Sequence, residues 1–239
     1  MSPCCSVVLA SLLSWRYGIC NILLALISIR EKIALKMKKL IIYFVALIYS
    51  MFAYGDVTNN DITAGLVKAA KERTSHLVIY NGAYRAIPYP NGDVPSYFGV
   101  CTDVIIRSYR KVGIDLQKNV HEDIVNNFNR YPSKRIWGLT KPDKNIDHRR
   151  VPILQVFFKR HGVSLEVKRD AKGYKPGDIV TWMLPGNLPH IGIVVDEKSQ
   201  DGKRPLIAHN IGLGPRINDM LFDYPITGHY RYDGVTKYN

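Results

Sequence analysis

Apolar residues recur at helical spacing through the first part of the chain. Residues 62–73 predict a short helix with a polar face, and residues 77–80 a short strand. A longer helix is predicted for residues 101–112, whose apolar positions 101, 104, 105, 109 and 112 fall on one face. Asp103 in its first turn and basic residues near its end suit the helix dipole, and Gly113 is a natural stop.

The pattern is less regular between residues 120 and 158. Residues 120–129 predict another helix, which Pro132 would end. Residues 131–150 read as a long polar loop, and long loops in compact domains are often functional. The apolar residues 156–158 fit either a helix or a strand.

The C-terminal part changes to the period of two that is typical of strands. Strands are predicted at residues 179–183, 190–196 and 206–210, and a last one from residue 228. On the second of these, the apolar residues 191, 193 and 195 share one face, whereas His190 and Gly192 share the other. Helices followed by an antiparallel meander predict an α+β domain.

The N-terminal part predicts export. Lys38 and Lys39 precede an apolar run that ends in small residues at Ala53 and Gly55, which are the three parts of a secretory signal. We therefore expect a signal peptide at 37–55, a single domain at 56–239, and an extension at 1–36 that is a mis-assigned start. The alternative is a genuine second apolar segment at residues 7–29, but Arg16 interrupts it. After signal cleavage we expect no stable membrane span, and a periplasmic or secreted protein.

The net positive charge of the chain indicates which classes of partner it can attract. The chain has 33 Lys and Arg against 20 Asp and Glu, and most of the excess lies after residue 55. A basic exported protein is attracted to anionic envelope polymers. The basic residues are spread along the chain without an RNA-binding motif, so we expect no nucleic acid partner. The sequence does not indicate an oligomeric state.

Cysteine usage singles out one thiol. Of four Cys residues, three precede Met37, so only Cys101 would remain after processing. A lone thiol in an oxidising compartment is either buried and inert or kept for chemistry. Cys101 opens a predicted helix, and a helix N-terminus lowers the pKa of a thiol. His190 opens one predicted strand and His209 lies near the end of the next, so antiparallel neighbours can place their side chains together.

These residues resemble the motifs of the NlpC-type cell-wall peptidases, a branch of the papain-like cysteine hydrolases. The matching positions are Tyr89, Cys101, Lys175-Pro-Gly-Asp178, His190-Ile-Gly-Ile193 and His209. The resemblance implies a papain-like fold, with Cys101 as nucleophile, His190 as base, His209 as the residue that orients it, and Tyr89 near the oxyanion. Asn210 is an alternative orienting residue. The superfamily usually has Asp-Cys-Ser where this chain has Gly-Val-Cys-Thr-Asp.

A closer resemblance, over residues 78–234, is to the YijF-like family, whose activity is unassigned. Shared motifs include Gly-Val-Cys-Thr-Asp-Val, Asn-Ile-Asp-His-Arg-Arg-Val-Pro, Leu-Pro-His-Ile-Gly-Ile-Val and His-Asn-Ile-Gly. The second of these contains Asp147, His148, Arg149 and Arg150, which form either a substrate clamp or an internal salt-bridge network.

These observations predict an exported cysteine hydrolase that cleaves amide bonds in peptidoglycan stem peptides or cross-links. It would need no cofactor and no metal, since His121-Glu-Asp123 reads as helix capping rather than a ligand cluster. The alternatives are a non-catalytic envelope-binding module on the same fold, and an amidase or thioesterase with another exported substrate.

Overall fold

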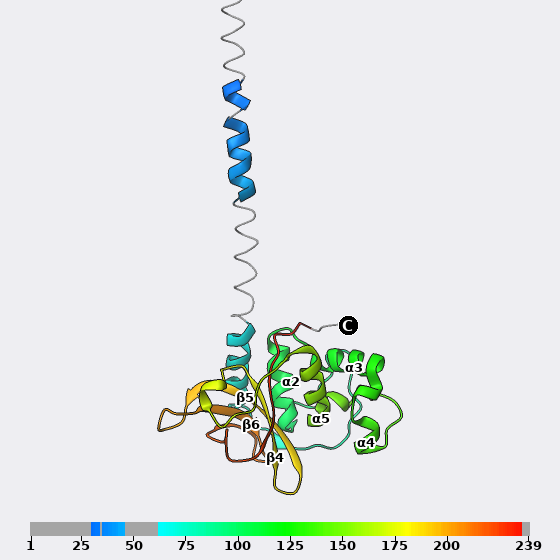
Figure 1. The fold of residues 1–239 in the computed structure, drawn as a ribbon. Coiled ribbons are helices and arrows are strands. Elements are labelled where there is room, and N and C mark those ends of the chain that lie inside the picture. Colours follow the sequence, from blue (N-terminus) through cyan, green and yellow to red (C-terminus); the bar gives the residue numbers. More distant parts are fainter. Residues whose placement is uncertain (1–29, 34, 46–61, 236–239) are drawn as a thin grey trace, which may run out of the picture. The chain divides into compact units, whose positions relative to one another are not determined.

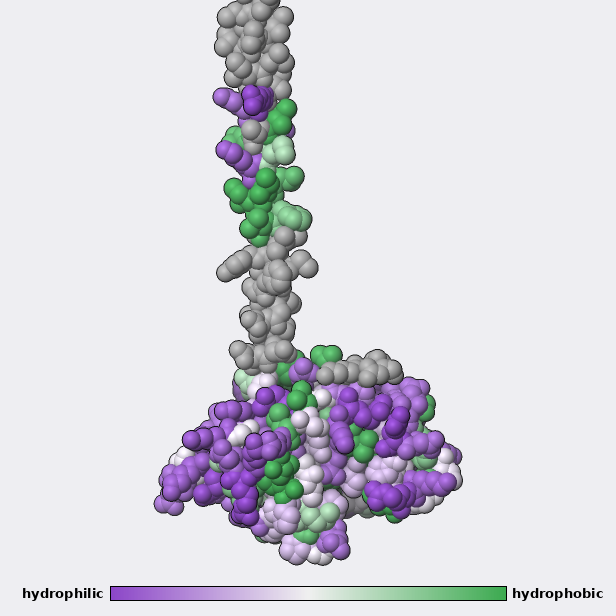
Figure 2. All heavy atoms as spheres, in the orientation of Figure 1, coloured by the Kyte–Doolittle hydropathy of each residue, from purple (hydrophilic) through white to green (hydrophobic). Residues whose placement is uncertain are grey.

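The computed structural model describes residues 30–33, 35–45 and 62–235 (Figure 1). The chain divides into two units, Met1–Val57 and Thr58–Asn239. In the first unit the described residues are helical, and residues 40–45 are exposed and largely apolar (Figure 2). No described helix is both long and apolar enough to cross a membrane. Most of the expected extension at 1–36 and the end of the expected signal peptide lie outside the described residues.

The second unit is a mixed α+β structure, as the sequence predicts. A helix at residues 62–73 comes first. The helices that follow are α2 (Cys101–Lys111), α3 (Leu116–Asn127), α4 (Ser133–Trp137) and α5 (Val151–His161), with short 3-10 turns η1 (Phe128–Arg130), η2 (Asp147–Arg149) and η3 (Ala171–Gly173). The strands are β1 (Ile79–Tyr80), β2 (Phe98–Gly99), β3 (Val163–Ser164), β4 (Ile179–Leu184), β5 (Leu188–Lys198), β6 (Pro205–Asn210), β7 (Pro215–Asn218) and β8 (Ile226–Arg231).

The main sheet is antiparallel and has the order β3-β8-β4-β5-β6-β7. The predicted helix at 101–112 and the three predicted strands between residues 179 and 210 are confirmed within a few residues. The helix predicted at 120–129 begins earlier, because Asp115 caps it by accepting hydrogen bonds from the backbone amides of Gln117 and Lys118. The expected loop at 131–150 contains α4 and η2, and the ambiguous residues 156–158 belong to α5.

Each face of the sheet is covered by a different apolar cluster. Side chains of α2, α3 and α5 pack with Ile179, Ile191 and Ile193 in the larger cluster. Trp182 and Val194 belong to a smaller cluster on the other face, closed by residues of the β7–β8 connection. Each fully buried aliphatic or aromatic side chain contributes about 1.5–3 kcal/mol, so the larger cluster is the main anchor of α2. This packing places the first residue of α2 against β5.

Candidate active site

Cys101 is the first residue of α2 and is 5% exposed. The start of the helix is held by Asp103, whose carboxylate accepts a hydrogen bond from the backbone N–H of Val100 at 2.7 Å. The thiol lines a cavity of about 920 Å³, together with residues from β1, α4, α5 and the β4–β5 hairpin. Cys101 therefore lines a cleft formed by helices and by the β4–β5 hairpin.

The thiol is protonated at rest. Burial raises the pKa of Cys101 to about 11, and the nearby charge of Asp103 adds to this. The backbone amides of Ile191 and Thr102 and the Tyr80 hydroxyl act in the opposite direction but are outweighed. The expectation of a lowered pKa at the helix N-terminus is therefore wrong, because burial exceeds the effect of the helix dipole. Such a thiol needs a general base to become a nucleophile.

A chain of three polar side chains lies on neighbouring strands. Nε2 of His190 is 3.1 Å from Nδ1 of His209, and Nε2 of His209 is 3.0 Å from Oδ1 of Asn218. Both His side chains are 2% exposed. Burial, followed by the effect of His209, lowers the pKa of His190 to about 3, and burial also lowers the pKa of His209. Both imidazoles are thus neutral near pH 7.

The Asn218 oxygen determines the tautomer of both imidazoles. Because Oδ1 can only accept, Nε2 of His209 carries the proton, and Nδ1 of His209 becomes an acceptor. Nε2 of His190 then donates to it, which leaves an unprotonated Nδ1 on His190. A neutral imidazole with one free lone pair is the form that a general base requires. Asn218 is not among the site residues that the sequence predicts.

Cys101 contacts the backbone of β5 at the position next to His190. The N–H group that acts on the Cys101 sulfur belongs to Ile191, the residue directly after His190. Within residues 62–235, no hydrogen bond joins the Cys101 sulfur to the His190 imidazole. His190 instead shares its sheet face with Trp182, whose ring centroid is 6.0 Å away. The structure therefore brings His190 of β5 and His209 of β6 together and places Cys101 next to β5.

Tyr80, not Tyr89, is the tyrosine beside the nucleophile. Tyr80 is 44% exposed overall, but its hydroxyl lies against Cys101, where partial burial and the sulfur raise its pKa to about 12. Tyr89 packs its ring edge on His121, at 5.2 Å between centroids, and lies beneath the ammonium group of Lys144. The position expected for Tyr89 is thus wrong. The parallel pairing of β1 with β2, immediately before α2, brings the more distant tyrosine to the site.

The Asp147–Arg150 motif, for which a substrate clamp and an internal network were both expected, forms mainly internal contacts. Arg149 binds Asp103 through two hydrogen bonds of 2.9 and 2.8 Å, with both side chains 3% exposed. Asp147 accepts a 3.1 Å hydrogen bond from Arg150. Burial, followed by the charge of Arg149, lowers the pKa of His148 to about 3. Of the four residues of the expected clamp, only the two arginines line the Cys101 cavity.

Asn210 does not orient His190. Its side-chain oxygen accepts a hydrogen bond from the backbone N–H of Gly212, and its amide nitrogen is buried without a partner. The alternation of β6 points Asn210 to the face opposite His209. His209 is therefore the partner of His190. In the described part of the chain, no three His, Cys, Asp or Glu side chains group as metal ligands would.

Comparison with known proteins identifies a family but no activity. The model of the family described as "Domain of unknown function (DUF1287)" matches residues 67–232. The chain is 46% identical over 167 residues to "Uncharacterized protein YijF" of Escherichia coli (strain K12), covering 70% of this chain and 80% of that protein. A structure of NlpC1 from Trichomonas vaginalis is 17% identical with a TM-score of 0.36, over 70% of this chain and 44% of that one. A TM-score this low does not establish a shared papain-like fold.

Proposed function

The chain belongs to the DUF1287 family, and from its own side chains we propose that it is a cysteine hydrolase that cleaves an amide bond through a thioester. The observation that carries this proposal is the hydrogen-bonded series from Asn218 through His209 to His190, beside the strand position that contacts Cys101. Such a series leaves one imidazole nitrogen unprotonated at neutral pH. Its placement next to the buried thiol of Cys101 supports nucleophilic catalysis rather than packing alone.

In the proposed first step, Nδ1 of His190 accepts the thiol proton while the Cys101 sulfur attacks the carbonyl carbon. The developing oxyanion would be stabilised by the first backbone amides of α2 and by the Tyr80 hydroxyl. The His190 imidazolium then returns the proton to the leaving amine as the C–N bond breaks, which leaves a thioester on Cys101. Because the His190 ring lies on the sheet face of Trp182, this step requires the imidazole to move towards Cys101 when substrate binds.

In the second step, water replaces the amine. Nδ1 of His190 takes a proton from the water as its oxygen attacks the thioester carbonyl carbon. The C–S bond breaks, the carboxylic acid product leaves, and the proton returns to the Cys101 sulfur. His209 would hold the imidazolium by hydrogen bonding in both steps, and Asn218 would hold His209. Neither step needs a redox partner.

We propose peptidoglycan stem peptides or cross-links as the substrate. Support comes from the basic composition of the chain and from the secretory-signal pattern at 37–55. The test is digestion of purified peptidoglycan by the full chain, with the products analysed by mass spectrometry. We expect new amine and carboxyl termini with the wild-type protein and none with Cys101→Ala. If a folded, fully reduced wild-type protein released no fragments, this substrate would be excluded.

A second candidate function is envelope binding without catalysis. The observation in its favour is the burial of Cys101 and the raised pKa of its thiol, which an inert core thiol would share. Sedimentation of the protein with insoluble peptidoglycan distinguishes the two functions. A binding module would co-sediment equally well as wild type and as Cys101→Ala, and would leave the polymer intact.

A further inference from the structure

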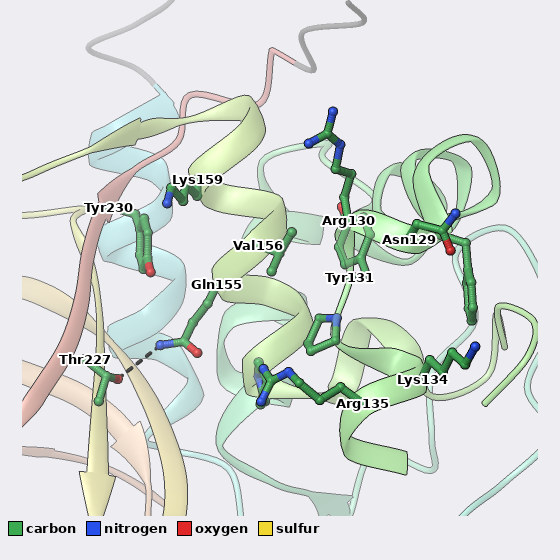
Figure 3. A pocket seen from close by; sticks show the side chains of 13 residues that line it. Asn129, Arg130, Tyr131, Lys134, Arg135, Gln155, Val156, Lys159, Thr227 and Tyr230 are labelled. Atoms are coloured by element: carbon green, nitrogen blue, oxygen red, sulfur yellow. Dashed lines mark hydrogen bonds between the residues drawn. The ribbon is translucent and has the colours of Figure 1, made fainter. Parts of the chain in front are cut away.

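A second cavity, of about 870 Å³, lies over the outer side of α5. Gln155 and Lys159 extend from α5 towards the side of Thr227 and Tyr230, and Val156 extends towards the opposite side (Figure 3). Thr227 and Tyr230 of β8 lie on one side of them, and the segment from Asn129 to Arg135 lies on the other. Gln155 donates a 3.1 Å hydrogen bond to the Thr227 hydroxyl, which ties α5 to β8 within the cavity. The cavity is open to solvent and is lined by both polar and apolar residues.

The charge of this cavity has one sign. Arg130, Lys134, Arg135 and Lys159 line it, and none of its 13 lining residues is Asp or Glu. Within the described residues, none of these four side chains forms a salt bridge or donates a hydrogen bond. Other cations of the unit, such as Arg149 and Arg160, are paired with carboxylates. Four unpaired cations around one hollow form a strongly positive site.

This cavity adjoins the one that contains Cys101. Arg135, Pro152 and Gln155 line both. A ligand that occupies the two cavities together would thus pass over the start of α5, with Arg135 at the junction. The Cys101 cavity and the basic cavity are therefore continuous along these three shared residues.

We propose that the cavity of Arg130, Lys134, Arg135 and Lys159 is a subsite for oxyanion groups, carboxylates or phosphates, on the substrate whose amide bond is presented to Cys101. Guanidinium groups bind such oxyanions through paired hydrogen bonds, and ammonium groups bind them as point charges. The inference that this ligand is part of the substrate rests on the proposed hydrolase function. The inference that the cavity binds oxyanions is independent of that function.

The test measures binding to the full chain by titration calorimetry with three probes. These are a tetraglutamate peptide with blocked ends, the matching tetraglutamine peptide, and inorganic tripolyphosphate. We expect tetraglutamate, tripolyphosphate or both to bind, and tetraglutamine not to bind. The carboxylate and phosphate probes thereby distinguish the two sources of oxyanion. Failure of both anions to bind the wild-type protein would overturn the subsite.

Matched variants separate a built site from general attraction to a basic protein. Lys134→Gln combined with Lys159→Gln removes two charges from the cavity, whereas Lys172→Gln combined with Lys203→Gln removes two exposed charges elsewhere. We expect the first pair to weaken binding about tenfold and the second pair to leave it nearly unchanged. Equal weakening by both pairs would show non-specific attraction and contradict the proposal.

The same experiment separates failure of the subsite from failure of the hydrolase. Binding is measured with wild type and with Cys101→Ala, which should be equal because the thiol is not part of the basic cavity. The protein could bind the anions in a manner that depends on Lys134 and Lys159 and yet cleave no peptidoglycan. That result would support the subsite and exclude peptidoglycan as the substrate. Loss of that dependence in a protein that does cleave would reject the subsite alone.

Discussion

At the scale of single residues, the site combines a thiol that is protonated at rest with an imidazole that is kept neutral. Burial is the first cause of both states, because it disfavours the charged form of each group. The ordinary advantage of a helix N-terminus for a thiolate is lost at Cys101. Transfer of the thiol proton to His190 therefore becomes the step on which the proposed chemistry depends.

The rate of Cys101 alkylation should report this directly. Because its thiol pKa is about 11, we expect the iodoacetamide reaction rate of the free protein to rise steadily from neutral to alkaline pH without a plateau below pH 9. The measurement is the alkylation rate by mass spectrometry, with Cys101→Ala as the blank. A plateau at or below pH 7 would indicate a preformed thiolate and contradict the raised pKa.

Asn218 should affect activity far more than stability. Asn218→Leu removes the acceptor that determines the tautomer of His209, so we expect about a 10²-fold loss in kcat/KM. This is less than the roughly 10⁴-fold loss that follows when the residue in direct contact with the base is replaced. Asn218→Asp keeps an acceptor oxygen and should retain most activity. Assays on peptidoglycan fragments, with thermal unfolding as a control for folding, check this. Full activity of Asn218→Leu would exclude the positioning role.

The pH dependence of stability follows from His190. Its pKa is about 3 when folded and near 6.5 when unfolded, so below pH 6.5 the unfolded state binds more protons. Its stabilising contribution is complete above pH 6.5 and is lost at about 1.4 kcal/mol per pH unit as the pH falls towards 3. We expect the free energy of unfolding, measured with urea, to fall less steeply with decreasing pH in His190→Gln than in the wild type. Parallel curves would argue against a neutral buried His190.

At the scale of elements, the start of α2 is held by a turn distant in sequence. Asp103 caps the helix through the Val100 amide and binds Arg149 of η2, while the Thr102 hydroxyl donates to the Arg149 carbonyl at 3.1 Å. Arg149 thus supports the start of α2 through contacts within the protein.

Breaking this ion pair on one side should be costly. Arg149→Met leaves the Asp103 carboxylate buried without its partner, and we expect a loss of about 3–5 kcal/mol in the free energy of unfolding. Asp103→Asn combined with Arg149→Met should recover part of this loss. Denaturant unfolding of the two single variants and the double variant measures the coupling. Additive losses would show that the pair does not act as a unit.

At the scale of the whole molecule, positive charge and two adjoining cavities suggest how a long anionic substrate would lie. The Cys101 cavity and the basic cavity share the start of α5, so binding and chemistry would use one helix as a common wall. The face of the second unit seen in Figure 2 is mainly hydrophilic, which suits contact with a hydrated polymer.

Export is the prediction that belongs to this scale. The Lys38-Lys39 pair and the apolar run after it predict cleavage near Gly55–Asp56, so the chain recovered from the envelope should begin close to Asp56. N-terminal sequencing by mass spectrometry provides the measurement. Deletion of residues 2–36 should leave the exported product unchanged. An exported product that begins upstream of Met37 would show that the N-terminal extension is translated and retained.

The sequence by itself determined the features that depend on local pattern. Helical and alternating periodicity located α2 and the strands β4, β5 and β6, and it placed His190 and His209 where antiparallel pairing joins them. These predictions succeed because the apolar face of an element is set by residues a few positions apart. The lone thiol after residue 55 was equally visible.

Only the tertiary structure decided which distant residues complete the site. Asn218 reaches His209 because β7 pairs with β6 in one register, which opposes Asn218 to Ile207. Tyr80 replaces Tyr89 because β1 pairs with the strand before α2. Arg149 faces Asp103 because a loop folds back on the helix. Register and loop closure depend on contacts across the whole chain, and burial, which sets the pKa of Cys101, exists only once the chain has folded.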